Sequence, residues 1–448
     1  MSCLLRCFLA GLTCVLLGGI AAARDDVPAR SGATTTSADE TATVAFQFDS
    51  PTTILSAQDM DRNGLLFPDG TLWFLRQEGR DPYYISAAGG RLSQSARLPA
   101  GSYAFAGTLE SFHPAQSRNG LPVWSLTTGR QQPSPDGADF DRDYAGGGPT
   151  YALALPDSAS ADEVCGRAAG SMARRSVLLQ IYHGEYHLFA PRGLPAHGGS
   201  GMAISCDGGA TFEKIGQILA PQVSREEFLA AQALAVHADV GLWADGAMVE
   251  ADARGERDCG TPPCDDKREW YYYLVFTDHN APAERYTGLS IARVRVQDLM
   301  RAVRQRRAPA FRKYYNPSGA LTLEGDYFTE SGIGGRSTPV LVTPGQYMNT
   351  PGVVYDEYLK KYLLFYQANQ KRVELRTSKN LMAWSVPVVA FQLDSASDRR
   401  VFYPSAAGDG PDPEVLDQTF YLYFLVRERP EGRWVNPQLL REKVSVKR

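Results

Sequence analysis

Three ionisable side chains alternate along the segment Tyr182–His187, which continues an apolar aromatic run. In an extended strand, side chains two residues apart share a face, so His183, Glu185 and His187 would lie together. Such a face can ligate a metal or form the wall of a polar pocket. Because no further ligands follow at a metal-binding spacing, we expect no metal here. A binding role for His183 and an acid role for Glu185 remain open, beside the alternative of simple loop hydrogen bonds.

Other carboxylates stand in short polar segments between apolar runs: Asp59 and Asp61, Asp245, Asp278 and Glu330. Hydrolysis of a glycosidic bond needs two carboxyl groups in different environments. One is protonated and faces the leaving oxygen, while the other is ionised and faces the anomeric carbon or a water. Asp278 ends an aromatic strand much as His183 does, and is a candidate binding residue at the same rim. A hydrogen bond within a turn or at a strand end is the alternative role for each aspartate.

One sequence unit recurs five times along the chain, and we expect its strands to position these side chains. Each unit has a short segment with small residues or proline, then a strongly apolar aromatic strand, then a polar strand, rich in residues that favour strands. Radial repetition of small antiparallel sheets protects their edges. We therefore predict an all-β fold, a five-bladed β-propeller, with Ala42–Phe48 completing the last blade. The aromatic strands are expected within Thr71–Leu75, Val177–Tyr182, Trp270–Phe276, Tyr362–Tyr366 and Phe420–Leu425.

Two local signals have a defined geometry. The segment Ser205–Phe212 has the pattern Ser-x-Asp-Gly-Gly-x-Thr-Phe, an Asp-box, in which Asp207 accepts backbone hydrogen bonds in a tight turn between two strands. We expect a hairpin there and no catalysis. A helix is predicted over Ser224–Ala235, because Ser224 and Glu227 have the spacing of a capping box.

The beginning of the chain predicts export. Arg6, the apolar stretch Phe8–Ile20 and the small residues Ala21–Ala23 form a secretory signal pattern that is too short to span a bilayer. We therefore expect a signal peptide at 1–23, a disordered spacer at 24–43, a propeller domain at 44–448, and a periplasmic or secreted protein with no membrane anchor. The 448 residues carry a net charge of -4, which gives no electrostatic reason to expect nucleic acid.

Four cysteines would remain after signal removal: Cys165, Cys206, Cys259 and Cys264. An even number suits disulfides in an oxidising compartment. Cys259 could pair with Cys264 across its short loop, and Cys165 with Cys206. A zinc site is the competing interpretation, but tight paired spacing and histidine partners are lacking in the sequence.

The inner segment Trp243-Ala-Asp-Gly-Ala-Met-Val249, followed by the aromatic strand Trp270-Tyr-Tyr-Tyr-Leu-Val275, resembles the five-bladed glycoside hydrolases of the arabinanase and β-xylosidase type. The resemblance extends over Thr53–Val446 as a pattern. It implies a base on the first blade, an orienting aspartate on the third and an acid on the fourth.

Residue by residue, the resemblance makes Asp59 or Asp61 the base and Asp245 the orienting acid. On the fourth blade the chain departs from the pattern, because Tyr347–Gly352 contains no carboxylate. Glu330, on a glycine-rich loop, or Glu185 would then have to supply the acid.

Aromatic residues on the predicted inner strands, Trp243 and Tyr403, are expected to contact a sugar ring. The leading hypothesis is an exported glycoside hydrolase that acts on a polysaccharide or oligosaccharide, with no cofactor; an arabinose- or xylose-containing substrate is one candidate. The alternative is a non-catalytic propeller that binds glycan or protein. A sialidase-like enzyme is a third hypothesis, prompted by the Asp-box.

Overall fold

The computed structural model describes 18 parts of the chain, all within the compact unit Val44–Arg448. The expected signal peptide and spacer lie outside them, as do residues 206–212 of the Asp-box and the pair Cys259 and Cys264. The described residues are 44–55, 71–75, 83–87, 94–98, 102–106, 140, 144–153, 164–165, 177–189, 193–205, 213–233, 240–244, 248–257, 269–279, 288–322, 325–408, 415–428 and 435–447.

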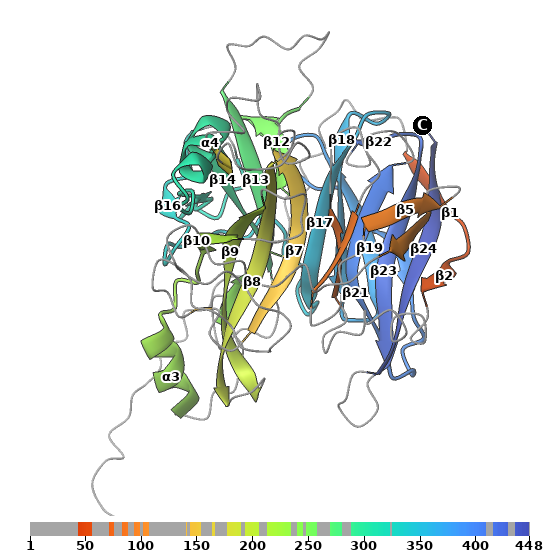
Figure 1. Ribbon diagram of the computed structural model, residues 1–448, viewed down its shortest axis with the longest axis horizontal. Coiled ribbons are helices and arrows are strands. Elements are labelled where there is room, and N and C mark those ends of the chain that lie inside the picture. Colours follow the sequence, from red (N-terminus) through yellow and green to blue (C-terminus); the bar gives the residue numbers. More distant parts are fainter. Residues whose placement is uncertain are drawn as a thin grey trace, which may run out of the picture. The chain divides into compact units, whose positions relative to one another are not determined.

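Most of the described strands belong to four antiparallel meanders (Figure 1), here named A to D in chain order. Meander A comprises β7 (Tyr144–Leu153), β8 (Val177–Phe189), β9 (Gly193–Ser205) and β10 (Glu213–Leu219). Meander B comprises β11 (Val240–Trp243), β12 (Met248–Asp252), β13 (Trp270–His279), β14 (Gly288–Arg295), β15 (Arg312–Lys313) and β16 (Glu330–Ser331). Meander C comprises β17 (Met348–Asp356), β18 (Lys361–Ala368), β19 (Arg372–Ser378) and β20 (Val388–Gln392). Meander D comprises β21 (Arg399–Gly408), β23 (Thr419–Glu428), β24 (Val435–Lys447) and β1 (Ala45–Phe48).

The remaining elements are short. They are β2 (Thr52–Leu55), β3 (Thr71–Leu75), β4 (Tyr83–Ala87), β5 (Gln94–Leu98), β6 (Ser102–Ala106), β22 (Val415–Leu416), α3 (Arg225–Ala233) and α4 (Val296–Arg304). β3 pairs with β4, and β5 with β6, in antiparallel fashion. A parallel pair between β9 and β11 joins meanders A and B into one hydrogen-bonded sheet.

The predicted aromatic strands are confirmed as β3, β8, β13, β18 and β23. The early strand is also confirmed: β1 pairs with β24 in antiparallel register, with Phe46 opposite Val446, and so becomes part of meander D. The chain is therefore all-β apart from its helices. Meanders A to D and the β3–β4 pair follow the order of the five predicted units, whereas a closed ring of five blades stays a prediction.

Strand β13 is apolar on both faces because it packs against two neighbours. Leu274 and Phe276 lie in a buried cluster shared with meander A, while Tyr273 and Val275 lie in a cluster shared with meander C. Strand β18 repeats this alternation, since its even-numbered residues face meander B and Phe365 faces meander D. Consecutive meanders thus pack face to face, which explains why these strands read as continuous apolar runs rather than as alternating patterns.

The local predictions on meander A are largely confirmed. Strands β9 and β10, which flank the Asp-box, pair in antiparallel fashion with Glu213 opposite Ile204. In α3 the capping box is reciprocal: the Ser224 N–H donates to Glu227 Oε2 at 2.8 Å, and the Glu227 N–H donates to Ser224 Oγ at 3.2 Å. Cys165 is disulfide-bonded; Cys206 lies outside the described residues, so this pairing stays a prediction.

One buried carboxyl group lies where the N-terminal strands join meander D. Glu442 of β24 is 4% exposed and sits between the pairs Phe48–Val444 and Thr52–Arg441. Its Oε2 atom makes no hydrogen bond to the described part of the chain. Burial, with a smaller contribution from the charge of Asp49, raises the pKa of Glu442 to about 8.

This raised pKa predicts that stability falls as pH rises. The folded protein holds the Glu442 proton up to a pKa of about 8, whereas the unfolded chain releases it near 4.5. The free energy of unfolding therefore decreases as pH rises between these two values, and it becomes constant above pH 8. We expect Glu442→Gln to remove this loss and to raise the free energy of unfolding at pH 8, as measured by urea unfolding.

The matched control is Glu226→Gln, at an exposed carboxylate of α3. It should keep the wild-type dependence of stability on pH. If Glu442→Gln shows the same slope as wild type between pH 5 and 8, Glu442 is not protonated in the folded protein.

Candidate active site

The first strands of meanders A, C and D carry the same irregularity. In β7 the register passes from Gly147 to Thr150, in β17 from Asn349 to Gly352, and in β21 from Phe402 to Ser405. Each step spans three residues, opposite two on the neighbouring strand, so each is a β-bulge with one extra residue. Every bulge contains a proline, which has no N–H to donate to the ladder. These prolines are Pro149, Pro351 and Pro404.

The residue before the proline is conformationally strained in two of the bulges. Thr350 has φ +48 and Tyr403 has φ +51, in the left-handed region that β-branched and bulky residues rarely adopt. Thr350 is 3% exposed, and its Oγ1 forms no hydrogen bond with the described residues. Because bulges and strained residues concentrate at functional sites, where they redirect side chains, these positions define the candidate active site.

Meander B has a longer interruption at the corresponding place. Trp243 of β11 pairs with Thr277, and Met248 of β12 pairs with Leu274. Five positions on the first strand thus face three on β13, which leaves two extra residues. Asp245 belongs to this insertion by sequence and lies outside the described residues.

A buried hydroxyl fixes the strand that leads to Asp245. Ser200 Oγ donates to the Leu242 carbonyl at 2.9 Å and accepts from the Ala244 N–H at 3.0 Å. Ser200 is 0% exposed and lies on β9, opposite His183 in the register. Meander A therefore holds the backbone of meander B just before the candidate acid.

Polar side chains connect meanders B and C beside the bulge of β17. Thr277 Oγ1 donates to Asn349 Oδ1 at 2.9 Å, and Asn349 Nδ2 donates to the Tyr347 hydroxyl at 3.0 Å. The ring of Tyr347 meets that of His279 edge-on, with centroids 5.7 Å apart. Burial lowers the pKa of His279 to about 3, so its imidazole is neutral at physiological pH.

Asp278 lies next to His279 and is held by two hydroxyl groups. Its Oδ2 atom accepts from Ser290 Oγ at 2.7 Å and from Ser337 Oγ. Asp278 is 7% exposed. Both hydroxyl groups donate to this oxygen, so the arrangement fixes the position of the Asp278 carboxyl group.

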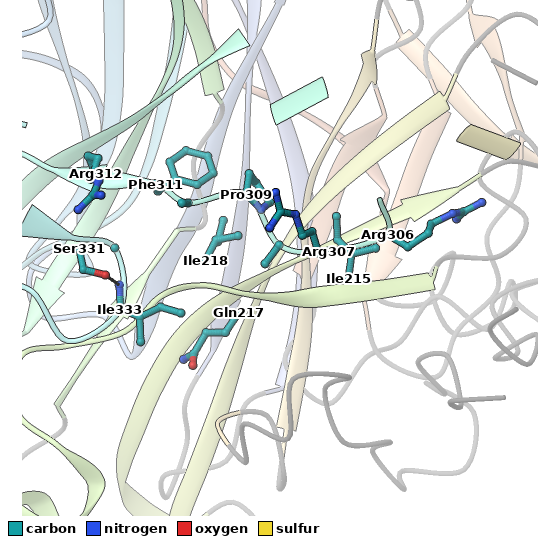
Figure 2. A pocket seen from close by; sticks show the side chains of 13 residues that line it. Ile215, Gln217, Ile218, Arg306, Arg307, Pro309, Phe311, Arg312, Ser331 and Ile333 are labelled. Carbon is teal, nitrogen blue, oxygen red and sulfur yellow. Dashed lines mark hydrogen bonds between the residues drawn. The ribbon is translucent and has the colours of Figure 1, made fainter. Parts of the chain in front are cut away.

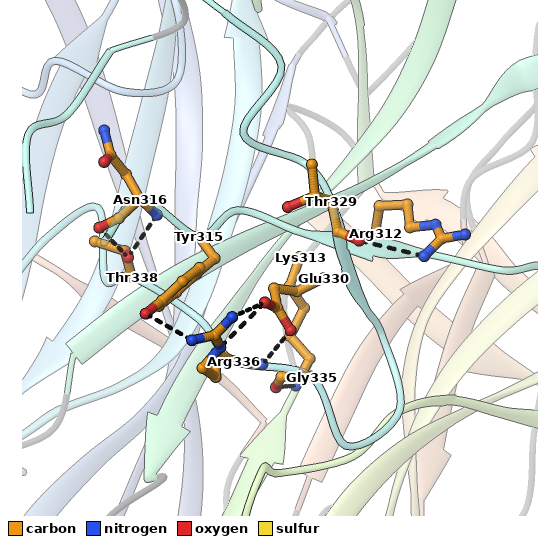
Figure 3. Close-up of polar contacts among 9 residues, drawn as sticks. All are labelled: Arg312, Lys313, Tyr315, Asn316, Thr329, Glu330, Gly335, Arg336 and Thr338. Carbon is orange, nitrogen blue, oxygen red and sulfur yellow. Dashed lines mark hydrogen bonds and ion pairs between the residues drawn. The ribbon is translucent and has the colours of Figure 1, made fainter. Parts of the chain in front are cut away.

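Glu330 belongs to a neighbouring cluster around β15 and β16 (Figure 3). Arg336 Nη2 pairs with Glu330 Oε1 at 2.6 Å, and its guanidinium lies 4.1 Å from the centre of the Tyr315 ring. Hydrogen bonds from Arg336 lower the pKa of Glu330, which is therefore ionised at neutral pH. This state suits a base or an ion pair and does not suit a proton donor.

Lys313 of β15 lies opposite Glu330 of β16 in the strand register. Its ammonium group is buried and donates to the carbonyls of Ala220 at 2.8 Å and Gly335 at 2.5 Å. Burial lowers the pKa of Lys313 to about 8, and the charges of Asp278 and Glu330 act in the opposite direction. Two predicted site residues therefore act electrostatically on one buried cation.

The other predicted site residues are placed less completely. Asp59, Asp61 and Asp245 lie outside the described residues. Trp243 and His183 are described by backbone only: Trp243 ends β11, and His183 lies in β8 between Gly146 and Ser200. Glu185 is half-buried on β8, opposite Tyr144, and Tyr403 is half-buried at the bulge of β21.

Sequence reasoning overlooked Ser200, Asn349, Ser337 and Lys313. A signal for the bulges was available, because proline interrupts the first strand of three units, and a proline within a strand marks an edge or a bulge. Lys313 had no such signal, since its burial follows from packing against meander A. Among the described residues, no group of three or more His, Cys, Asp or Glu side chains could hold a metal ion.

No family model and no curated protein matches the chain. Its structure is similar to glycoside hydrolases, the group indicated by the sequence resemblance. The catalytic domain of a GH62 α-L-arabinofuranosidase from Coprinopsis cinerea has a TM-score of 0.41 and 10% identity, covering 88% of this chain and 97% of that one. A family 117 glycoside hydrolase from Zobellia galactanivorans has a TM-score of 0.40 and 9% identity, covering 90% of each chain. An α-L-arabinofuranosidase from Lactobacillus brevis has a TM-score of 0.37 and 10% identity, covering 83% and 89%.

With TM-scores below 0.5, these similarities carry no argument about the chemistry of this chain. The bulged first strands and the polar residues beside them define the candidate site.

The buried imidazole predicts a loss of stability in acid. The folded protein protonates His279 only near pH 3, whereas the unfolded chain does so near 6.5, so stability falls as pH drops between these values. We expect the His279 ring resonances to remain those of the neutral imidazole down to about pH 4 in an NMR titration. A His279 transition near pH 6.5 would contradict the burial of this ring.

Proposed function

We propose that the chain is a glycoside hydrolase whose active site lies at the interrupted first strands of its meanders. One observation carries the proposal: β7, β17 and β21 are bulged at matching positions, and the interruption between β11 and β12 at the corresponding place contains Asp245 in its sequence. The first strands of all four meanders thus deviate from regular pairing at corresponding positions. The interruption in meander B contains a carboxylate in its sequence.

The residues around this place suit a substrate rich in hydroxyl groups. Asp278 is a fixed acceptor, His279 is a neutral ring, and Tyr347 and Asn349 form a hydrogen-bonded pair. Tyr403, at the bulge of β21, adds an aromatic ring that can stack on a sugar. This combination of polar groups and aromatic rings is what carbohydrate recognition requires.

Catalysis in this proposal divides between carboxyl groups on different meanders. Asp59 acts as base and Asp245 orients the substrate or the acid. Glu185 is the stronger candidate for the acid, because Glu330 is held ionised by Arg336. The complete proposal is a five-bladed propeller that is exported through a signal at residues 1–23 and stabilised by a Cys165–Cys206 disulfide.

The test is hydrolysis of a panel of polysaccharides and oligosaccharides, including arabinose- and xylose-containing ones. We expect Asp59→Asn and Asp245→Asn to lower kcat/KM by about 100-fold or more, and Glu185→Gln to lower it by a similar factor. Asp298→Asn, on α4, is the matched control and should leave the rate unchanged. Equal activity of Asp59→Asn, Asp245→Asn and the wild type would refute these assignments.

A non-catalytic glycan-binding protein is the second candidate, and Asn349 favours it. At the bulge where the family pattern has its acid, this chain has an amide whose oxygen and nitrogen are both hydrogen-bonded within the protein. Calorimetry that detects glycan binding, combined with no product after prolonged incubation, would select this function over the enzyme.

A further inference from the structure

A pocket lies outside the interrupted strands. It has a volume of about 570 Å³ and opens between β10 and the chain segments on either side of β15 and β16 (Figure 2). None of its lining residues comes from β7, β11, β12, β17 or β21. The volume lies within the range of pockets that enclose small ligands.

Backbone contacts join the walls of this pocket. The Gly332 N–H donates to the Phe311 carbonyl at 2.9 Å, and the Ala220 N–H donates to the Gly332 carbonyl at 3.0 Å. A Cβ atom at Gly332 would collide with the carbonyl oxygen of Ile218. Because the chain segments meet this closely, the pocket is formed before any ligand binds.

The pocket is positively charged. Arg306, Arg307 and Arg312 line it, and none of the described lining residues is Asp or Glu. Arg306 is neutralised by Glu213, with 2.7 Å between Nη1 and Oε2, and lies at the opposite end of the pocket from Arg312 in Figure 2. Arg307 and Arg312 form no ion pair with the described carboxylates, and both are exposed.

A large exposed apolar side chain accompanies these two guanidinium groups. Ile218 and Phe311 are nearly fully buried at the base, and Ile333 is 49% exposed at the rim. A ligand that fits has an anionic group for the arginines, which bind carboxylate and sulfate bidentately, and a compact body with an apolar face. A sugar ring that bears a carboxylate or a sulfate combines both features.

We propose that this pocket is a second binding site, specific for an acidic saccharide. Anionic groups of the saccharide contact Arg307 and Arg312, which line different parts of the pocket, and a sugar ring lies on Ile333. That the ligand is a saccharide rests on the proposed function of the chain. That the ligand is anionic rests on the charges of the pocket alone.

Calorimetry with three disaccharide probes tests this site: a neutral one, its uronate counterpart and its sulfated counterpart, each at low and high salt. At least one anionic probe should bind about tenfold more tightly than the neutral one and weaken with salt. Arg307→Ala and Arg312→Ala should each weaken its binding about tenfold. Arg301→Ala, at an exposed arginine of α4 that pairs with Asp298, is the matched control and should bind like wild type.

Equal binding of the neutral and anionic probes, or unchanged binding by the Arg307→Ala/Arg312→Ala double variant, would overturn the site. Inorganic sulfate that binds as tightly as the sulfated disaccharide would overturn its saccharide part. Comparison of the two probes distinguishes a uronate from a sulfate ligand. Asp245→Asn should abolish hydrolysis and keep this binding, so failure of the proposed function and failure of the second site are separate results.

Discussion

Burial of both faces of β13 and β18 is the constraint on which the rest of the structure depends. Alternate residues of each strand enter different apolar clusters, with Phe276 on one side of β13 and Tyr273 on the other. A shift of one residue would exchange these faces and place every side chain in the wrong cluster. The register of the two strands is therefore fixed by packing, and so is the register of the first strands that pair with them.

Packing fixes the position of the second strand of each meander, and this allows the first strand that pairs with it to be irregular. A residue such as Thr350, with a positive φ and a following proline, costs on the order of 1–3 kcal/mol. The neighbouring strand offsets that cost, because β18 is buried along its length and cannot adjust to the bulge. The same division of roles holds for β21, where Tyr403 is strained beside the buried strand β23. Regular packing on one strand thus sustains irregular geometry on the next.

The strands themselves were predictable from the sequence, because aromatic runs such as Trp270–Phe276 have no other stable environment than a sheet buried on both faces. The capping box of Ser224 and Glu227 was equally readable, since its hydrogen bonds join residues three positions apart. The pairing of β1 with β24 agrees with the prediction that the early strand completes the last unit.

The candidate site was less predictable. Asp278 was identified from its place at a strand end, but its partners Ser290 and Ser337 come from a different strand and a distant loop. Glu330 was expected to serve as an acid, and only the loop that brings Arg336 against it reveals an ionised group. Such contacts depend on how segments far apart in the chain pack, and no local pattern encodes them.

The pairing of β1 and β2 with β24 also determines the order in which the protein can be completed. Thr52 and Arg441 are hydrogen-bonded although 389 positions separate them. On a translating ribosome, β1 and β2 emerge early and remain without their partner until β24 has been synthesised. Because closing so long a loop is slow, we expect β1 and β2 to pair with β24 only after β24 has been synthesised. Until that pairing, the backbone groups of β1 and β2 that face β24 lack their hydrogen-bond partners.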